Sequence, residues 1–199
     1  MRYTGPKWRI NRRENYTVLG STEKWKRRQS LPGQFPVLAK RPSEYAIQFR
    51  EKQKVKRMYG MSERQFRRFF RLALKSTGNT SLKFLQLLEL RLDNVLYRLG
   101  FASTRAQARQ IILHRHVKLN GRVHNIASTI LKVGDEIELK DQMLNSVVVM
   151  SNLKNKVVKM IPSWLEKLEK GGKVLQEPSR LDIDNNIKEN LIVELYSKS

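Results

Sequence analysis

The sequence predicts an α+β fold: a mostly helical body, a module of two helices on a small antiparallel sheet, and an irregular basic N-terminal arm. Three observations support this prediction. Apolar residues recur with a helical period across residues 44–114, and from Val117 a period of two replaces it. Prolines and glycines interrupt residues 1–42 so often that neither period survives there. A chain of 199 residues, 40% of them hydrophobic, is long enough for one cored domain or two small ones.

The N-terminal arm, residues 1–42, contains structure breakers separated by basic residues, at Gly5-Pro6, Pro32-Gly33, Pro36 and Pro42. Alone, it cannot bury enough apolar surface to offset the entropy lost on ordering, so we expect it to fold against a partner. The alternative is a flexible tail. The aromatic content of the arm is higher than such tails usually have, which favours the first interpretation.

Two helices are predicted after the arm. Ser43 starts one over about residues 44–59, which Gly60 ends, and Ser62 starts another, with Gln65 three residues on as a capping box. The second helix has an apolar stripe on one face and five cations on another, namely Arg64, Arg67, Arg68, Arg71 and Lys75. Like charges stacked in this way destabilise an isolated helix, so we expect an anionic partner there rather than a solvated face.

The middle of the chain predicts both helices and strands. Residues 80–90 are apolar on nearly every side and predict a central helix, whose pattern continues to Leu99, and Thr104 starts another helix to about residue 114. Alternating apolar residues then flank Asn120-Gly121, a strong signal for a type I′ hairpin, and a further strand follows at residues 137–139. We therefore expect two short helices packed on a twisted antiparallel sheet.

The C-terminal segment predicts one more helix and a return to the body. Ser163 and Glu166 form a capping-box pattern for a short helix, which Gly171-Gly172 would end. Residues 191–196 are largely apolar, and an apolar terminus needs a core to dock on.

The charge balance requires an anionic partner. The chain has 40 Lys and Arg against 18 Asp and Glu, a net charge of +22, and residues 1–75 alone have 21 against 5. A compact body so charged repels itself unless nucleic acid, a membrane surface or an acidic protein surrounds it. The absence of cysteine excludes disulfides, thiolate metal sites and cysteine nucleophiles. With no apolar run of membrane-spanning length and no signal-peptide pattern, we expect a soluble protein that acts where it is made.

The predicted module places several cations on one surface. Arg91 and Arg98 are seven residues apart, and Arg105 and Arg109 are four apart, so each pair shares a helical face. Apolar residues hold the second of these helices to the core by its opposite side. Arginine suits bidentate contact with phosphate, and helix N-termini add backbone donors. Such a surface would recognise the backbone shape of a nucleic acid rather than its base sequence.

These residues also resemble a known family. Residues 91–139, beginning RLDNVLYRLGFASTRAQARQIILHRHVKLNGRVHNIAS, are similar to the αL RNA-binding module that is named after small-subunit ribosomal protein four. Some pseudouridine synthases, tyrosyl-tRNA synthetases and a ribosome-rescue heat-shock protein share that module. Four flanking segments resemble the ribosomal family itself, in its bacterial or organellar, zinc-less form: RYTGPK (2–7), YAIQFREKQKVKRMYGMSERQFRRFF (45–70), SWLE (163–166) and NLIVELYSK (190–198). The resemblance spans the chain and is weakest over residues 8–42.

The resemblance implies a structural protein of the small ribosomal subunit that is not an enzyme. Family members bind small-subunit rRNA first at the five-way junction of the 5′ domain, nucleate assembly there, and contact ribosomal protein five near the mRNA entrance. The expected partners are therefore small-subunit rRNA and ribosomal protein five, with mRNA as a further candidate and no membrane. The expected location is the ribosome of a bacterial cytoplasm, or alternatively of a plastid or other organelle.

The resemblance also implies three parts: residues 1–42 as an arm ordered on rRNA, residues 43–90 with 153–199 as the helical body, and residues 91–152 as the RNA-binding module. Carried onto this chain, it assigns RNA contacts to each part. In the arm these are Arg2, Tyr3, Lys7, Arg9, Arg12 and Arg13. In the body they are Arg50, Lys54, Lys56, Arg57, Arg64, Arg67, Arg68 and Arg71. In the module they are Arg91, Arg98, Ser103, Thr104, Arg105, Arg109, Gln110, His114 and Lys118.

One departure from the family concerns zinc. Many members hold a zinc ion with arm cysteines that flank the positions of Trp8 and Asn11, and this chain has none. We therefore expect no metal and no cofactor, and an arm ordered by rRNA and by stacking of residues such as Trp8. His114 and His116 are spaced as metal ligands could be, but without cysteine or a carboxylate pair a surface or phosphate-facing pair is favoured. Asp93 could be a general base, but we expect it to orient a neighbouring arginine.

Two other function classes are weighed against the structural rRNA binder. An RNA-modifying enzyme, such as a pseudouridine synthase, would need a further catalytic domain with an active-site aspartate, and we find no such domain. A polybasic membrane-surface protein would need an amphipathic helix whose apolar face is left for lipid, whereas the apolar faces here are used by the core. Assays of uridine isomerisation and of liposome flotation distinguish these classes, and we expect both to be negative.

Overall fold

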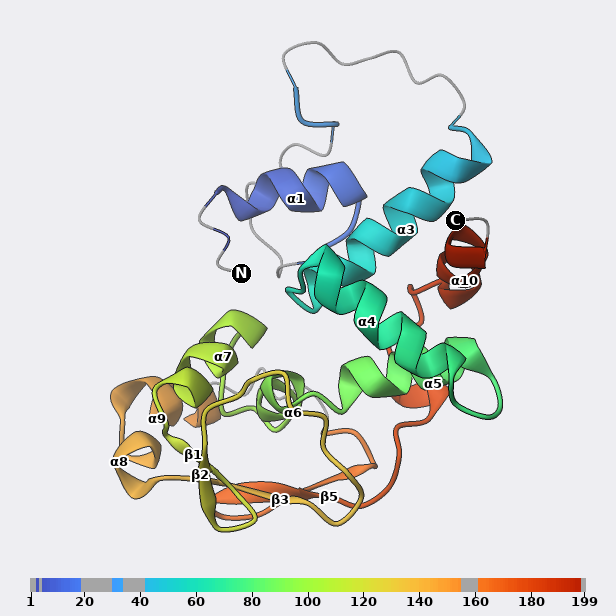
Figure 1. The fold of residues 1–199 in the computed structure, drawn as a ribbon. Coiled ribbons are helices and arrows are strands. Elements are labelled where there is room, and N and C mark those ends of the chain that lie inside the picture. The colour runs from blue at the N-terminus through green and yellow to red at the C-terminus, as the bar shows by residue number, and fades with distance from the viewer. Residues whose placement is uncertain (1–2, 4, 19–29, 34–41, 155–160, 198–199) are drawn as a thin grey trace. The chain divides into compact units, whose positions relative to one another are not determined.

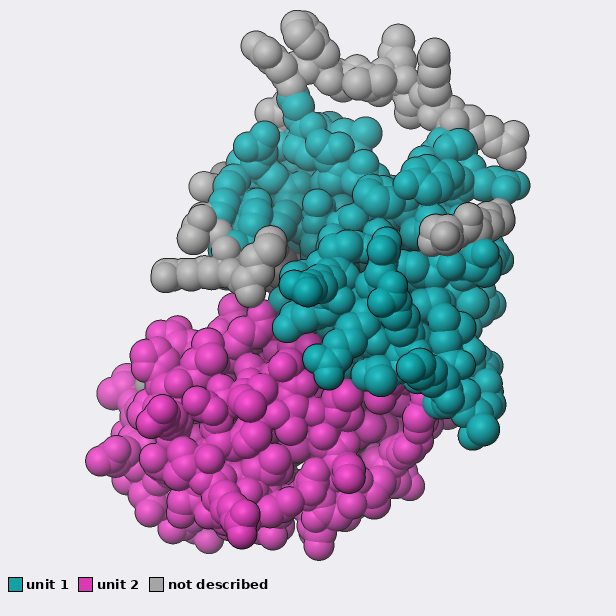
Figure 2. All heavy atoms as spheres, viewed as in Figure 1, with its two compact units in different colours: residues 1–82, 185–199 teal, residues 83–184 magenta. Residues whose placement is uncertain are grey.

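The structure is a computed structural model that describes the chain except for residues 1–2, 4, 19–29, 34–41, 155–160 and 198–199. The chain divides into two compact units (Figure 2), residues 1–82 with 185–199, and residues 83–184. The first is helical and the second combines helices with an antiparallel sheet, which confirms the α+β class predicted from the sequence.

The first unit contains helices from both ends of the chain. They are α1 (Lys7–Glu14), α3 (Glu44–Met58), α4 (Glu63–Leu74), the start of α5 (Thr80–Glu89) and α10 (Glu189–Ser197) (Figure 1).

Helices α3 and α4 begin where the sequence predicted. The Ser43 hydroxyl accepts a hydrogen bond from the Ala46 N–H at 3.3 Å, and the Ser62 hydroxyl accepts one from the Gln65 N–H at 3.4 Å. These caps satisfy backbone donors that the first helical turn leaves unpaired. The apolar stripe of α4 is buried, through Phe66, Phe69, Phe70 and Ala73.

The C-terminal helix α10 packs against α3, as expected of an apolar terminus. Ile192 is fully buried. The Gln48 side-chain amide of α3 donates to the Glu194 carboxylate at 2.9 Å, and the Tyr196 ring stacks on Phe70 with 4.5 Å between ring centroids. This end of the chain therefore closes the core of the first unit.

The N-terminal arm is not irregular throughout. Lys7–Glu14 forms α1, which packs against α3. Ile10 is buried, and the buried Glu14 carboxylate is paired with Arg57 and, at 3.7 Å, with Arg50. Ile10 is the one buried apolar residue of α1, beside the buried polar residues Asn11 and Arg12, which is too little to produce an apolar helical period in the sequence. Residues 19–29 and 34–41 of the arm lie outside the described residues.

The second unit has a five-stranded antiparallel sheet of order β2-β1-β3-β5-β4. The strands are β1 (Val117–Leu119), β2 (Arg122–His124), β3 (Glu136–Leu139), β4 (Leu165–Lys167) and β5 (Gly171–Val174). The helices are α6 (Leu92–Arg98), α7 (Arg105–Leu113), α8 (Asp141–Leu144), α9 (Val147–Lys154) and a 3-10 turn (Arg180–Asp182), after the end of α5.

The predicted hairpin joins β1 and β2. Asn120 and Gly121 have φ angles of 48° and 78°, which a type I′ turn requires at both central positions. Val117 lies opposite His124 in the resulting register. Helices α6 and α7 pack on the sheet (Figure 1), and the buried apolar residues of these helices and of the α6 C-cap are Leu92, Val95, Leu96, Leu99, Ala108, Ile111 and Ile112. The two predicted helices on a small sheet are therefore confirmed.

The prediction of a short helix after Ser163 is wrong. Those residues form β4 and β5, which pair with each other, and β5 also pairs with β3. A Cβ atom at Gly171 would overlap the Ile137 carbonyl oxygen, and one at Gly172 would lie 2.6 Å from a Leu99 methyl carbon. The two glycines thus permit close approach of neighbouring elements and do not end a helix.

The compact units also divide the chain differently from the expected boundaries. Residues 153–184 were expected in the helical body, yet they belong to the second unit, and residues 185–199 belong to the first. Trp164 explains the difference, because its large side chain is fully buried in the core of the second unit. Among the helices described, none is both long and apolar enough to cross a membrane.

Candidate nucleic-acid interface

Helix α7 directs its arginines away from the core of the second unit. Thr104 caps the helix by accepting a hydrogen bond from the Gln107 N–H at 3.1 Å. Ala108 and Ile112 are fully buried. Arg105 and Arg109 therefore lie together on the opposite side, where both are partly exposed.

Asp93 of α6 holds two arginines. The Arg91 guanidinium donates to both carboxylate oxygens, from Nε to Oδ1 at 3.0 Å and from Nη2 to Oδ2 at 2.8 Å. Arg109 donates to Oδ2 from Nε at 3.1 Å and from Nη2 at 2.6 Å. The carboxylate is buried, so it orients these side chains as the sequence suggested.

Glu89 and Asn94 hold two more arginines. The Asn94 side-chain amide donates to the Glu89 carboxylate at 2.7 Å, and its oxygen accepts from Arg105 Nε at 2.8 Å. The Glu89 carboxylate also accepts from Arg98, at 2.8 Å and 3.0 Å. Both Glu89 and Asn94 are fully buried. We call these three buried residues and their four arginines the α6–α7 network.

The α6–α7 network has more cations than anions. Three guanidinium groups, those of Arg91, Arg98 and Arg109, pair with the carboxylates of Glu89 and Asp93, and the fourth, of Arg105, donates to the Asn94 amide oxygen. The side chains of Arg98 and Arg109 are 19% and 20% exposed, whereas that of Arg91 is 2% exposed. Arg105 also lies over the Tyr97 ring, with 4.7 Å from the guanidinium carbon to the ring centroid. The network therefore presents oriented positive charge at its surface.

The structure separates Arg91 from the other residues expected to contact RNA in the module. Its side chain is buried against Asp93, where it supports the network but offers little surface to a ligand. Ser103 is exposed, and its hydroxyl donates to the Gln107 side chain at 2.8 Å. Gln110 and His114 are exposed on α7 and at its end, and Lys118 is partly exposed on β1.

The His114 and His116 rings lie nearly parallel, with 6.3 Å between centroids. Three His, Asp or Glu side chains that could together hold a metal ion are not found in the described part of the chain.

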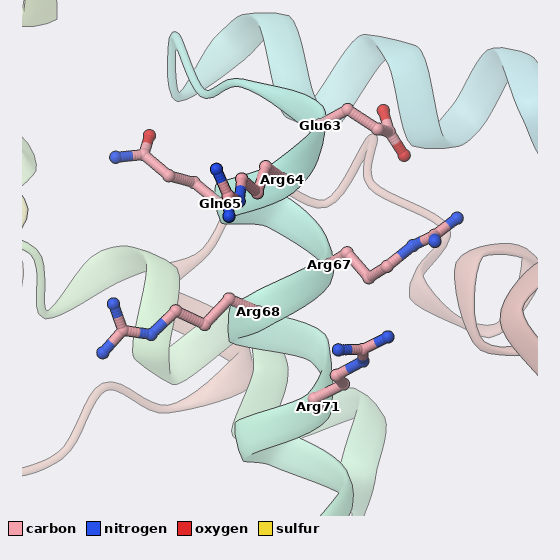
Figure 3. Close-up of a pocket in the computed structure, with 6 residues that line it drawn as sticks. All are labelled: Glu63, Arg64, Gln65, Arg67, Arg68 and Arg71. Atoms are coloured by element: carbon pink, nitrogen blue, oxygen red, sulfur yellow. The ribbon is translucent and has the colours of Figure 1, made fainter.

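A second cationic surface lies on α4 in the first unit. Arg64, Arg67, Arg68 and Arg71 are exposed and line a shallow hollow with Glu63 and Gln65 (Figure 3). Arg67 and Arg71 extend to the same side of the helix as Glu63, and Arg68 extends to the other side with Gln65 (Figure 3). The side chains of Arg64, Arg68 and Arg71 make no hydrogen bond or ion pair within the described residues.

Glu63, the acid beside this arginine surface, is neutralised from α3. Lys52 and Lys56 donate to its two carboxylate oxygens at 2.7 Å and 2.8 Å. Burial alone would raise the pKa of Glu63, but the hydrogen bonds from the two lysines outweigh burial and lower the pKa to about 2. Burial and the neighbouring Glu63 carboxylate raise the pKa of Tyr196. Glu63 thus stays ionised and forms ion pairs with the lysines of α3, not with the arginines of α4.

The remaining predicted contacts of the body have partners within the first unit. Lys54 donates to the Asn186 carbonyl oxygen at 2.7 Å and pairs with Glu51 at 2.8 Å. Lys56 is paired with Glu63, and Arg50 and Arg57 are paired with Glu14 of α1. Burial raises the pKa of Glu14, although Arg57 and Arg50 oppose the shift. These cations of α3 therefore hold the first unit together.

The predicted contacts of the arm fall into three groups. Tyr3, Lys7, Arg9 and Arg13 are exposed. Arg12 is buried, lies over the Trp8 ring at 5.2 Å, and donates to the Ser30 carbonyl oxygen at 2.6 Å. Arg2 lies outside the described residues. The stacking expected of Trp8 therefore involves an arginine of its own helix.

Sequence reasoning did not identify Glu89 and Asn94 as part of this site. Their signal was present, because a carboxylate and an amide stand in the most apolar stretch of the chain. A buried polar group must be hydrogen-bonded, and several arginines were the obvious donors. The distances that join Asn94 to both Glu89 and Arg105 depend on how α5, α6 and α7 pack.

Comparison with known proteins assigns the family. The family model described as ribosomal protein S4/S9 N-terminal domain matches residues 2–89, and the S4 domain model matches residues 90–137. Small ribosomal subunit protein uS4 of Caldicellulosiruptor bescii is 49% identical over 99% of both chains. The proteins of that name from Opitutus terrae and Mycoplasma mobile are 44% and 43% identical, over 99% of this chain and 98% and 99% of their own. This chain belongs to the small ribosomal subunit protein uS4 family.

Membership of the uS4 family confirms the resemblance found in the sequence. The S4 domain match, residues 90–137, includes α6, α7, β1 and β2, and it contains every module residue that was expected to contact RNA. Strands β4 and β5 lie beyond that match, although they complete the same sheet. The uS4 relatives are named as ribosomal proteins and not as enzymes.

Proposed function

We propose that this chain binds small-subunit rRNA as a structural protein of the small ribosomal subunit and catalyses no reaction. Membership of the uS4 family supports this proposal. The observation that carries it is the α6–α7 network, in which two buried carboxylates and one buried amide orient four arginines, so that positive charge is in excess. Phosphate is the ligand that oriented guanidinium groups fit best.

The resemblance extends the proposal to a place and a role in the ribosome. The chain would bind first at the five-way junction of the 5′ domain and nucleate assembly there. It would later contact ribosomal protein five near the mRNA entrance and contribute to translational accuracy. The ribosome would be that of a bacterial cytoplasm, with an organelle ribosome as the alternative.

The RNA contacts are proposed to come from three places. The exposed residues of the arm and the arginine surface of α4 would supply charge, and the α6–α7 network with Ser103, Thr104, Gln110, His114 and Lys118 would supply oriented donors. Arg91 and Arg12 would support their neighbours, because both are buried. Arg50, Lys54, Lys56 and Arg57 would combine packing of the first unit with contact to the RNA backbone.

The mechanism is electrostatic clamping of a folded RNA. Each phosphate that the protein neutralises releases counterions, so the affinity falls as the salt concentration rises. If about eight phosphates are neutralised, the slope of log affinity against log salt should be on the order of −6 to −7. A nearly flat dependence on salt would contradict the mechanism.

Reversing two charges of α7 tests the site directly. We expect Arg105→Glu with Arg109→Glu to weaken binding to small-subunit rRNA by at least about a hundredfold, because two contacts are lost and two repulsions are added. The matched control is Lys132→Glu with Lys173→Glu, which makes the same change of charge at exposed positions outside α6 and α7. Filter binding at several salt concentrations gives the affinities. Wild-type affinity in the first variant would refute the site.

Protection of rRNA from chemical probing tests the proposed location. We expect the purified protein to protect nucleotides around the five-way junction of the 5′ domain. Protection confined to another domain of the rRNA would reject the five-way junction as the binding site but would not affect the family assignment. No protection of small-subunit rRNA at all would reject the proposed function.

A further inference from the structure

The structure contains two kinds of arginine that reach the surface. Arg98, Arg105 and Arg109 of the α6–α7 network are partly exposed and held by buried acceptors. The side chains of Arg64, Arg68 and Arg71 on α4 are exposed and have no hydrogen-bond or ion-pair partner within the described residues. Both sets are cationic and both are open to a ligand. They differ in how freely the guanidinium groups can move.

The network arginines are oriented before any ligand binds. Arg109 and Arg98 each use two nitrogen donors on one buried carboxylate, and Arg105 is held by Asn94 and by the Tyr97 ring. Their acceptors cannot shift easily, because Glu89, Asp93 and Asn94 are at most 1% exposed. The guanidinium groups are therefore fixed relative to one another.

The α4 arginines are long side chains on one helix that point to different sides of it (Figure 3). Glu63 does not orient them, because Lys52 and Lys56 occupy its two carboxylate oxygens. Each can therefore follow a phosphate over several ångströms, at the cost of side-chain entropy when it binds.

We propose that the α6–α7 network, positioned by Glu89, Asp93 and Asn94, provides discrimination in favour of a particular folded RNA, while the α4 arginines provide affinity for any RNA backbone. This inference rests on the proposed function. A fixed set of donors loses little entropy on binding a matching arrangement of phosphates, but it cannot adjust to another arrangement. Mobile donors accept any phosphate spacing with similar affinity.

The experiment compares two ligands, the folded junction of the small-subunit 5′ domain and a perfect RNA duplex of equal nucleotide number. Three variants of the full chain are measured against both: Asp93→Asn, the pair Arg105→Lys with Arg109→Lys, and the triple Arg64→Gln, Arg68→Gln and Arg71→Gln. Thermal unfolding of each variant is followed in parallel. Discrimination is the ratio of the two dissociation constants.

Asp93→Asn separates positioning from charge. The substitution removes a negative charge, so electrostatics alone would tighten binding to both RNAs. If Asp93 is a positioning residue, we expect junction binding to weaken about tenfold while duplex binding stays equal or tightens. General unfolding would weaken both together, so it cannot imitate this result.

The lysine pair covers the case in which Asp93→Asn does not fold. Lysine keeps both charges but has no planar fork of donors, so the fixed geometry is lost. We expect junction affinity to fall about tenfold and duplex affinity to fall less than about twofold.

The α4 triple should lower the affinity for both RNAs by a similar factor. It should also make the slope of log affinity against log salt less steep by about 2.

Two results would overturn the inference. One is a folded Asp93→Asn protein that binds the junction as tightly as the wild type. If Asp93→Asn does not fold, the equivalent result is a lysine pair that discriminates between the two RNAs as well as the wild type. The other is an α4 triple that loses discrimination as strongly as the network variants. Failure of the proposed function looks different, because the wild type would then bind neither RNA in a salt-dependent way.

Discussion

At the scale of single residues, Asn94 links the two halves of the α6–α7 network. Its side-chain amide donates to the backbone carbonyl and to the carboxylate of Glu89, at 2.8 Å and 2.7 Å, and its oxygen accepts from Arg105. The residue is fully buried, so no water can replace these bonds without rearrangement. The packing of α5 against α6 and the orientation of Arg105 therefore depend on the same side-chain amide.

We expect Asn94→Ala to lower the free energy of unfolding by about 2 to 3 kcal/mol, because it leaves buried groups of Glu89 and Arg105 unsatisfied. Urea unfolding of the full chain measures the change. Asn125→Ala, at an exposed position of the same unit, is the matched control and should change stability by less than about 0.5 kcal/mol. Equal effects of the two substitutions would contradict this role.

Glu63 is the second residue with a specific electrostatic role. It joins α3 and α4 through Lys52 and Lys56, and the Tyr196 hydroxyl of α10 donates to it at 3.2 Å. Its pKa is lowered from 4.5 to about 2, so the ionised form is favoured by the folded state. The resulting stability is complete above pH 4.5 and is lost as the pH falls towards 2.

We therefore expect Glu63→Gln to reduce the thermal midpoint at neutral pH and to flatten its decline between about pH 4.5 and 2. Circular dichroism melts across that range measure both effects. Glu166→Gln, an exposed carboxylate on β4, is the matched control and should keep the wild-type profile. Parallel wild-type and Glu63→Gln curves through the acid range would refute the assignment.

At the scale of elements, the β3–β5 pairing depends on two glycines of β5, Gly171 and Gly172. Gly171 lies opposite Glu138, and Gly172 lies opposite Ile137 and close to the side chain of Leu99, the residue that follows α6. Any Cβ there would meet either the neighbouring strand or the helix that covers the sheet. The same dipeptide would also suit the end of a helix, which is why its local pattern misled the prediction.

We expect Gly171→Ala to destabilise the protein by about 3 kcal/mol, because the added methyl group must push β5 away from Ile137. Urea unfolding gives the free energy. The matched control is Lys173→Ala at an exposed position of the same strand, for which we expect a change within about 1 kcal/mol. A change below about 1 kcal/mol for Gly171→Ala would show that the strand can move at little cost.

At the scale of the whole molecule, the compact units do not follow the linear order of the chain. The second unit, residues 83–184, extends well beyond the S4 domain match and contains all five strands. Its core includes Trp164 and Val174, which no fragment ending at residue 152 would contain. The last helix, α10, then completes the first unit.

We expect a fragment of residues 83–184 to unfold cooperatively, because its core is complete. A fragment of residues 91–152 should fail to do so, because it lacks β4, β5 and Trp164. Chemical denaturation followed by circular dichroism compares the two. Equal cooperativity would show that β4 and β5 are dispensable for folding of the module.

Local patterns in the sequence determined much of this protein. Capping serines, the apolar stripe of α4, the Asn120-Gly121 hairpin and the cationic faces of α4 and α7 all depend on residues close in the chain, and these predictions are confirmed. The family could be recognised for the same reason, because its motifs are contiguous.

Only the tertiary structure decided the rest. Whether Gly171-Gly172 ends a helix or lies within a sheet depends on β3, some thirty residues away. Arg91 and Arg109 both pair with Asp93, and only their burial in the fold makes Arg91 an internal support and leaves part of Arg109 open to a ligand. Hydrogen bonds and steric contacts act over a few ångströms in space, so positions that are distant in the chain settle these questions.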